Sequence, residues 1–160
     1  MMKIDDRSKA VIVRWRDFNK FKQFLEAKKT ILIGGCFDTF HFGHLAFLKQ
    51  AKRQGDYLII ALESDKFIIN KKNKSPVHNQ WQRAQILSAL RMVDLIILLP
   101  YFKQDRNYDN LVTQIKPKII AVASQDNNIN NKRRQATAVG AQFVIVIKRL
   151  KQFASSKIRF

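Results

Sequence analysis

Five short runs of apolar residues, rich in Ile, Val and Leu, recur along the chain without alternating polar residues. They cover residues 30–36, 57–62, 95–99, 118–123 and 143–147. Strands that are covered on both faces of a parallel sheet have this composition, whereas a sheet with one solvated face alternates apolar and polar positions. The pattern therefore predicts five buried strands in a parallel sheet.

Stretches with helical periodicity lie between these runs. They cover residues 45–54, 80–91, 108–115 and 131–139. In the second stretch Ile86, Leu87 and Leu90 form an apolar stripe at helical spacing, while Arg83 lies on the polar side. Strands that alternate with helices predict an α/β, Rossmann-like fold with right-handed crossovers and helices on both faces of the sheet. Such sheets bind ligands beyond the carboxyl ends of their strands.

The chain is organised as a single domain. Its 160 residues contain no Gly/Ser/Pro-rich linker and no repeat of fixed period. We expect residues 1–29 to form an N-terminal helical lead-in and residues 30–160 to form the domain that carries the chemistry.

A glycine- and histidine-rich segment, GGCFDTFHFGH at residues 34–44, follows the first predicted strand and leads into an amphipathic helix. The paired glycines allow a phosphate-bearing ligand to approach the backbone, and a helix that begins near Gly43 directs free N–H groups to the same place. His41 and His44 are three residues apart, which places both imidazoles on one face of the helix start. Two such donors can stabilise a phosphoryl group whose oxygens gain charge during displacement.

Two other interpretations of the histidines stay open at this point. In one, a histidine caps the helix and the other is a surface residue. In the other, the pair binds a metal with Asp38 as third ligand, although the spacing, without a glutamate, is not that of zinc proteases. Asp38 either positions a ligand hydrogen bond or Mg²⁺, or is a turn former after the strand.

At these residues the chain resembles the HxGH nucleotidyltransferase superfamily and, within it, the cytidylyltransferase-like family, whose motif is G-x-F-D-x-x-H-x-G-H. The matching positions are Gly35, Phe37, Asp38, His41, Gly43 and His44. Further resemblance covers segments 55–59, 63–65, 91–94 and 154–158, and spans about residues 30–159 in all. The family includes glycerol-3-phosphate cytidylyltransferase and the adenylyltransferase of the ADP-heptose pathway, and the resemblance to the latter extends to a lead-in helix at 15–27.

The resemblance implies substrates and site residues. The substrates are CTP or ATP and a small phosphorylated alcohol or sugar, whose phosphate oxygen attacks the α-phosphorus so that pyrophosphate leaves, with Mg²⁺ bound mainly through the NTP phosphates. The implied catalytic residues are His41, His44 and Lys72, with Lys71 as the alternative to Lys72. The implied nucleotide-binding residues are Gly35, Cys36, Phe37, Asp38, Gly43, Arg83, Asp126, Ser155 and Ser156, and the implied substrate-binding residues are Asp65 and Arg149.

Several of these residues also have a purely structural interpretation. The lysines at 71, 72 and 74 are expected on a mobile, exposed loop, where they either close over a triphosphate or are merely solvated. Arg83 either makes a bidentate phosphate contact or is a surface arginine. Ser155 and Ser156 would cap a final helix and could present its N–H groups to a phosphate. Arg91 and Asp94 are expected to pair with each other or to lie at a homodimer contact.

Two segments depart from the family's pattern. Residues 123–126 are Ala-Ser-Gln-Asp where many relatives have Gly-Gly-Asp or Gly-Asp-Asp, and residues 150–154 replace a small turn that ends in glycine. The choice between CTP and ATP and the identity of the acceptor are therefore left open by the sequence.

The charge of the chain points to an anionic partner. Thirty Lys and Arg residues against twelve Asp and Glu residues give a net charge of +18, and residues 101–160 carry half of this excess. The alternative to an enzyme is accordingly a basic nucleic-acid-binding protein that retains the fold. Binding of nucleic acid would not require the two histidines, which favours the enzyme.

No apolar run approaches the length of a membrane span, and the N-terminus lacks the apolar core of a signal peptide, so a cytoplasmic protein without a membrane partner is expected. A single cysteine, Cys36, excludes an internal disulfide and a cysteine-rich zinc site.

Overall fold

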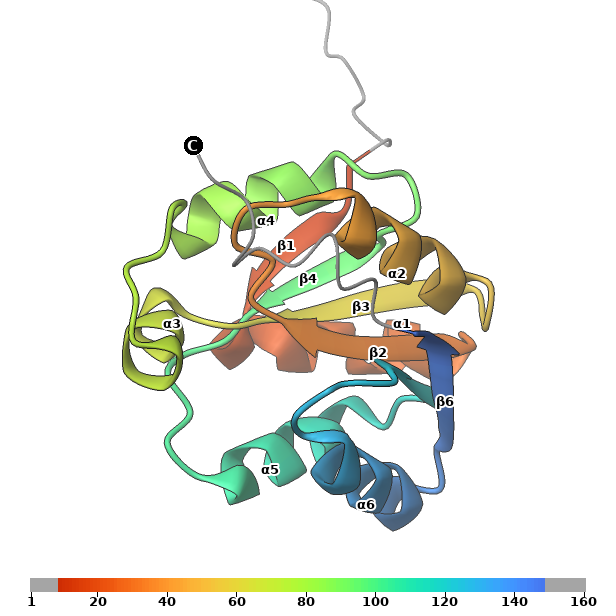
Figure 1. Ribbon diagram of the computed structural model, residues 1–160. Coiled ribbons are helices and arrows are strands. Elements are labelled where there is room, and N and C mark those ends of the chain that lie inside the picture. The colour runs from red at the N-terminus through yellow and green to blue at the C-terminus, as the bar shows by residue number, and fades with distance from the viewer. Residues whose placement is uncertain (1–8, 149–160) are drawn as a thin grey trace, which may run out of the picture.

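A parallel sheet of six strands forms the centre of the structure, a computed structural model that describes residues 9–148 (Figure 1). The strands are β1 (Val11–Arg14), β2 (Thr30–Gly35), β3 (Tyr57–Leu62), β4 (Leu95–Leu98), β5 (Ile119–Ala123) and β6 (Gln142–Ile147). They lie in the order β1-β4-β3-β2-β5-β6, and every neighbouring pair is parallel. The α/β fold is confirmed, and the five predicted strands are β2 to β6.

The first strand was not predicted, because the lead-in was expected to be helical. Val11, Ile12 and Val13 pair with residues 95–97 of β4 and form the edge of the sheet. Three β-branched residues favour a strand, but such a short run shows no period, and its partner lies more than 80 residues away in the sequence. The sheet therefore has six strands instead of five, and the lead-in supplies one of them.

Helices cover both faces of the sheet (Figure 1). They are the 3₁₀-helix η1 (Trp15–Phe21) and the α-helices α1 (Lys22–Glu26), α2 (Phe42–Lys52), α3 (Asp65–Lys72), α4 (Gln80–Ser88), α5 (Asp105–Ile115) and α6 (Ile129–Val139). Helices α2 and α4 lie on one face, while η1, α1, α5 and α6 lie on the other. Within residues 9–148 no helix has the length and apolar composition that a membrane crossing requires.

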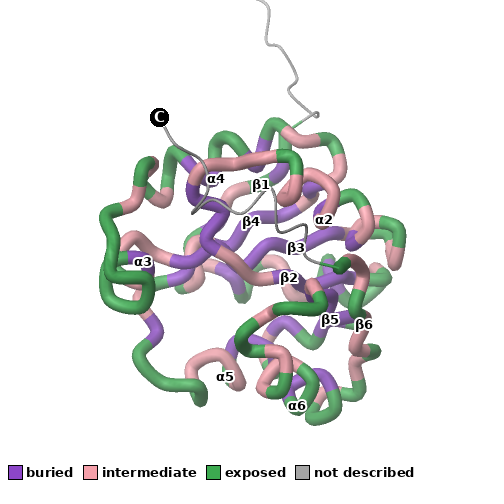
Figure 2. The backbone as a smooth tube through the Cα atoms, in the orientation of Figure 1, coloured by how far each residue is buried: buried purple, intermediate pink, exposed green. Residues whose placement is uncertain are grey.

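Alternate residues of the strands feed two hydrophobic cores, one on each face. In β2, Leu32 packs against the α5 and α6 side, whereas Ile31 and Ile33 pack against the α2 and α4 side. Figure 2 shows that the buried residues follow the strands, while the helices carry most of the exposed positions. Burial on both faces explains why the strands have no polar alternation.

Helix α3 was also missed. Ser64 caps its start by accepting a hydrogen bond from the Phe67 amide (3.2 Å), and Asn73, with φ 51°, ends it in the left-handed conformation. Lys71 and Lys72 therefore lie in the last turn of a helix, and the expectation of a continuous loop from 71 to 74 is wrong for these two residues. Both are exposed, as expected.

Asp94 does not pair with Arg91. Its carboxylate accepts a hydrogen bond from the Leu58 amide (2.7 Å) and forms an ion pair with Lys52. It therefore joins the end of α2 to the start of β3, and Arg91 is exposed. The homodimer stays a prediction.

The order in which successive strands join the sheet changes direction at β2, although all the strands are parallel. From β2 the chain runs through β3 to β4 on one side, and then returns to place β5 and β6 on the other side of β2. In open α/β sheets, ligands bind in the crevice beyond the carboxyl ends of the strands at this switch point. Here the crevice lies between Gly35 at the end of β2 and residues 124–128 after β5.

The turn before β3 supplies a test of the fold. A Cβ atom at Gly55 would lie 2.5 Å from the Lys29 carbonyl oxygen, whereas a Cβ atom at Gly34 would meet only the Ala61 oxygen at 3.8 Å. We expect Gly55→Ala to lower the free energy of unfolding by about 1–3 kcal/mol, because backbone must move to admit the methyl group. Gly34→Ala, the matched control, should be close to neutral. Urea denaturation of both variants measures this, and equal stabilities would contradict it.

Candidate functional site

The turn that leaves β2 is held in an uncommon backbone conformation. Phe37 and Thr39 have φ angles of 48° and 58°, in the left-handed region that residues with a side chain seldom adopt. Strain of this kind costs on the order of 1–3 kcal/mol per residue and is concentrated at functional sites. The turn carries Gly35 and Cys36 at its start and reaches His41 within five residues.

The two histidines lie against each other at the start of α2. His41 is the N-cap residue, and its Nδ1 accepts a hydrogen bond from the Gly43 amide (3.1 Å). The rings of His41 and His44 stack with their centroids 3.8 Å apart. Because Nδ1 of His41 is an acceptor, its proton lies on Nε2 in the neutral ring, which makes Nε2 a donor. The structure thus brings together the pair and the helix start, as expected from their spacing, and His41 is also a cap.

Burial keeps His44 neutral. Desolvation, together with smaller effects of the neighbouring His41 and of the charge of Lys72, lowers the pKa of His44 to about 3. Its Nδ1 is buried and has no hydrogen-bond partner within the described part of the chain. An unsatisfied buried nitrogen of this kind is a feature that a ligand can satisfy.

Asp38 connects the segment between α3 and α4 to the end of β2 through hydrogen bonds and an ion pair. Its Oδ1 accepts hydrogen bonds from the amides of Val77 (3.0 Å) and His78 (3.3 Å), and its Oδ2 lies 3.5 Å from Nζ of Lys74. Only 4% of the residue is exposed. These contacts are structural, but they join distant segments and are not those of a local turn former. The nucleotide-binding role of Asp38 stays a prediction.

Arg83 is fully buried, so the expectation that it lies on the polar face of its helix is wrong. Its guanidinium donates to the backbone oxygens of Cys36, Glu63 (2.9 Å) and His78 (3.1 Å), and forms an ion pair with Asp65 (2.8 Å). Four of its five N–H groups are therefore engaged within the protein. This geometry gives Arg83 and Asp65 the task of holding the strand ends, and their contacts with nucleotide or substrate stay predictions.

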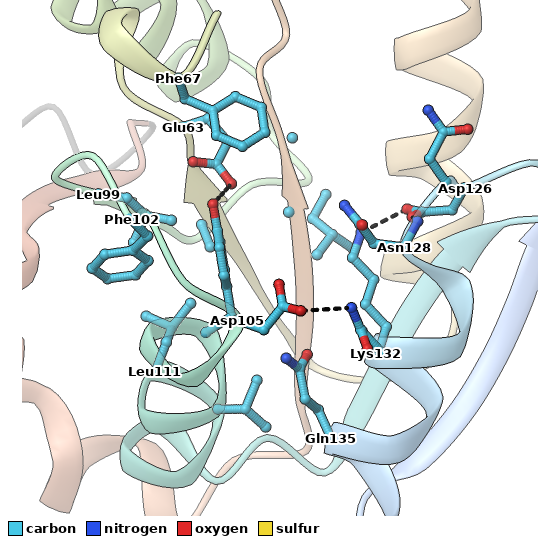
Figure 3. A pocket seen from close by; sticks show the side chains of 18 of the residues that line it. Glu63, Phe67, Leu99, Phe102, Asp105, Leu111, Asp126, Asn128, Lys132 and Gln135 are labelled. Carbon is cyan, nitrogen blue, oxygen red and sulfur yellow. Dashed lines mark hydrogen bonds and ion pairs between the residues drawn. The ribbon is translucent and has the colours of Figure 1, made fainter. Parts of the chain in front are cut away.

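A cavity of about 580 Å³ opens at the switch point, on the face of the sheet that α5 and α6 cover (Figure 3). Its volume lies within the usual range of small-molecule sites. Of the residues singled out in the sequence, Gly35, Cys36, Lys71, Lys72 and Asp126 line it. The two histidines are not among its lining residues, because α2 starts on the opposite face of the sheet. Gly34 and Gly35 lie between the two regions.

Two residues that the sequence analysis did not select are central to this cavity. Glu63 lies directly after β3 with 8% of its surface exposed, and its Oε1 accepts a hydrogen bond from the hydroxyl of Tyr108 (2.9 Å). Burial raises the pKa of Glu63 to about 7, although the Tyr108 hydrogen bond and the charges of Lys132, Arg83 and Lys72 act in the opposite direction. Burial and the adjacent carboxyl raise the pKa of Tyr108, which keeps its hydroxyl a donor.

The sequence offered little indication of this pair. Glu63 follows an apolar run, where a polar residue was expected to matter, but only contact with Tyr108 on α5 distinguishes it from an exposed carboxylate.

The charge of Lys72 affects ionisable groups on both sides of the site. Its charge lowers the pKa of Glu63 in the cavity and of His44 on the other face. It also acts against the burial that raises the pKa of Cys36, whose thiol stays protonated and is therefore no nucleophile. These interactions favour Lys72 over Lys71 as the lysine that approaches the strand ends.

Asp126 lies across the cavity from Glu63, in the turn that leads to α6 (Figure 3). Its Oδ1 accepts from the Asn128 amide (2.8 Å), and its Oδ2 pairs with Lys132 (2.6 Å). The aspartate that follows β5 thus lines the site even without the adjacent glycines of the family's pattern.

Three of the selected residues, Arg149, Ser155 and Ser156, lie outside the described residues. Within residues 9–148, no three His, Cys, Asp or Glu side chains gather where they could hold a metal ion.

Comparison with known proteins places this site in a family. The model of the cytidylyltransferase-like family matches residues 32–159, which include the turn after β2, both histidines and the cavity. The chain belongs to the cytidylyltransferase-like family. The resemblance stated from the sequence is thereby confirmed.

Curated relatives include FAD synthases and bifunctional HldE proteins. The chain is 36% identical over 100 residues to FAD synthase of Thermococcus sibiricus, which covers 62% of this chain and 66% of that protein. It is 34% identical over 135 residues to the bifunctional protein HldE of Campylobacter jejuni subsp. doylei, which covers 82% of this chain but only 27% of that protein.

Among solved structures, a lipopolysaccharide core biosynthesis protein from Thermoplasma volcanium superposes with a TM-score of 0.62 at 24% identity, covering 76% of this chain and 97% of that one. At this identity the likeness supports the fold alone.

The raised pKa of Glu63 predicts how stability changes with pH. Because the folded state binds this proton more tightly than the unfolded state does, the stabilisation is present below pH 4.5 and is lost as the pH rises through about 7. Relative to Glu63→Gln, the wild type should therefore lose at most about 3 kcal/mol of unfolding free energy over this range. Urea denaturation at several pH values measures the difference. The exposed Glu26→Gln is the control, and a difference that does not change with pH would contradict the prediction.

Proposed function

We propose that this protein is a nucleotidyltransferase that moves an AMP or CMP group from ATP or CTP to a small phosphorylated alcohol or sugar. A phosphate oxygen of the acceptor forms a bond to the α-phosphorus, the bond from that phosphorus to the oxygen bridging to the β-phosphate breaks, and pyrophosphate leaves with that oxygen. The observation that carries the proposal is the stacked histidine pair at the start of α2, beside the glycine end of β2 at the switch point.

The histidines and the helix start supply the stabilisation of charge. The donor Nε2 of His41, the first amides of α2 and the imidazole of His44 are suited to phosphate oxygens that gain negative charge in the transition state. His44 can stabilise these oxygens in its neutral form, without transferring a proton. No nucleophile from the protein is required, because the acceptor's own phosphate attacks.

The glycines of β2 allow one ligand to reach both regions. With the triphosphate at the histidines, the rest of the nucleotide and the acceptor extend past the end of β2 into the cavity, which Gly34 and Gly35 line. The ring of Phe37 covers Gly35 and comes within 2.9 Å of the place of a Cβ atom, so the ligand passes beside that ring. Lys72, whose charge acts on His44 and on Glu63, is in position to neutralise the phosphates between them.

Between the two nucleotides the relatives favour ATP, since flavin adenine dinucleotide, the product that the name FAD synthase states, contains an adenylyl group. The described chain gathers no metal-binding cluster of its own, so Mg²⁺ would be held mainly through the NTP phosphates. There it would neutralise part of the charge of the triphosphate.

The enzyme is tested by pyrophosphate release with each NTP across a panel of phosphorylated acceptors. We expect His41→Ala and His44→Ala each to lower kcat by about 10²-fold, the usual cost of losing a transition-state donor. His41→Asn should keep the helix cap but show the same loss, because asparagine caps well yet lacks the imidazole donor. His78→Ala is the control. Normal turnover of the double variant lacking both imidazoles would remove these residues from the phosphate site.

The basic excess also allows a nucleic-acid-binding protein. Residues 132–134 form a cluster of basic side chains, and each of them contacts another group of the protein. Lys132 pairs with Asp126, Arg134 pairs with Asp109, and Arg133 lies over the ring of Phe143. Arg133 and Arg134 stay exposed, but the charges of Lys132 and Arg134 are balanced by the two aspartates.

We therefore expect duplex DNA or RNA to bind only with dissociation constants of about 10⁻⁴–10⁻⁶ M at physiological salt, and to dissociate as salt rises. Nucleotide binding should depend less on salt, because directed hydrogen bonds add to the charge interaction. Fluorescence anisotropy and calorimetry between about 50 and 200 mM salt compare the two. Tight, sequence-dependent nucleic-acid binding without pyrophosphate release from any substrate pair would promote the alternative.

A further inference from the structure

The Glu63 carboxylate is only half satisfied by the protein. Its Oε1 accepts from Tyr108, but its Oε2 is buried and has no hydrogen-bond partner within the part of the chain that the structure describes. The residue is more than nine-tenths buried and lines the cavity (Figure 3). A buried acceptor without a partner costs about 1–3 kcal/mol, so a ligand that donates to it recovers this free energy.

The position of Glu63 is fixed from three sides. Its backbone oxygen accepts from the buried guanidinium of Arg83 (2.9 Å), and its backbone amide donates to Gly35 (3.0 Å). The Tyr108 hydroxyl holds the side chain, and the ring of Tyr108 packs edge-on against Phe102 with centroids 5.1 Å apart. A group held this firmly is pre-organised for recognition.

We propose that Glu63, positioned by Tyr108, determines acceptor specificity by receiving a hydroxyl group of the acceptor at its Oε2. This inference rests on the proposed nucleotidyl transfer and adds the part of the acceptor that is recognised. The acceptor then has two ends: a phosphate that reacts, and a neutral hydroxyl-bearing end that enters the cavity.

The charges around the cavity favour a hydroxyl over an ammonium group. Four lysines line it, Lys71, Lys72, Lys103 and Lys132, and they would repel a cation while attracting the acceptor's phosphate. Because burial raises the pKa of Glu63 to about 7, both protonation states of its carboxyl are accessible near neutral pH. A hydroxyl can pair with either state, because a protonated carboxyl both donates and accepts, whereas an ammonium requires the ionised form.

The wall of the cavity fits the carbon skeleton of such an acceptor. Leu99, Phe102, Leu111 and Val112 line the side next to Tyr108. Apolar walls with a few fixed polar groups are typical of sites that orient a small ligand. The single carboxyl in this apolar part selects which end of the acceptor enters.

The test compares acceptors with and without hydroxyl groups. The probes are glycerol 3-phosphate and glucose 1-phosphate, n-propyl phosphate as the analogue without hydroxyls, and phosphoethanolamine as the cationic analogue. The test variant is Glu63→Leu with Tyr108→Phe, which removes both partners together and leaves no unsatisfied hydroxyl behind. Glu26→Leu, at an exposed position of α1, is the matched control. Thermal unfolding and calorimetric NTP binding establish that the variants are folded and bind nucleotide.

We expect the wild type to prefer a hydroxylated probe in kcat/KM, and the double variant to lose about 10²-fold of that preference while NTP affinity is unchanged. Tyr108→Phe alone should raise the acceptor KM with little change in kcat, as a positioning residue would. An unchanged preference in the folded double variant, or phosphoethanolamine as the best acceptor, would overturn the inference and leave nucleotidyl transfer standing. No pyrophosphate release from the wild type with any NTP and acceptor would overturn both.

Discussion

The buried guanidinium of Arg83 is the interaction on which the carboxyl edge of the sheet depends. It binds the backbone oxygens that follow β2 and β3, at Cys36 and Glu63, and the oxygen of His78 before α4. Its charge is balanced by Asp65 at the first turn of α3. A buried cation without such partners is strongly destabilising, so these four segments are held in one arrangement. Arg83 binds the backbone of Cys36, where the turn toward the histidines starts, and the backbone of Glu63, whose side chain lines the cavity.

From the strand ends that Arg83 holds, the site extends to both faces of the sheet. The histidines belong to the α2 side and the cavity to the α5 and α6 side, and the glycine end of β2, with the ring of Phe37 against Gly35, lies between them. Low dielectric at the strand ends moves two pKa values in opposite senses, to about 3 for His44 and about 7 for Glu63. Desolvation disfavours the charged form of each group, which is the cation of His44 and the anion of Glu63. The site therefore presents largely neutral donors and acceptors at its centre, and its positive charge comes from lysines around the cavity.

Local patterns predicted the parts of this structure that depend on local sequence. Apolar runs predicted β2 to β6, and the turn with its paired histidines was recognised because its residues are contiguous. Helix α3, which Ser64 caps locally, was a local miss, whereas the other misses depend on distant partners. The edge strand β1 is defined by pairing with β4, and Arg83 could not be distinguished from a surface arginine until three chain segments met around it. Glu63 became informative only through Tyr108, 45 residues further along the chain.

The amino-acid composition makes a buried glutamate such as Glu63 unusual in this chain. The chain carries thirty Lys and Arg residues and only two glutamates, one exposed on α1 and one buried in the cavity. A protein with this balance attracts anions almost everywhere, so charge alone brings a phosphorylated ligand to the site but does not orient it. Glu63 provides orientation at one point, because its unsatisfied Oε2 can accept a hydrogen bond from a hydroxyl, whereas a fully ionised phosphate has no proton to donate. The general positive charge thus favours capture of a phosphorylated ligand, while the buried carboxyl of Glu63 favours one orientation of that ligand in the cavity.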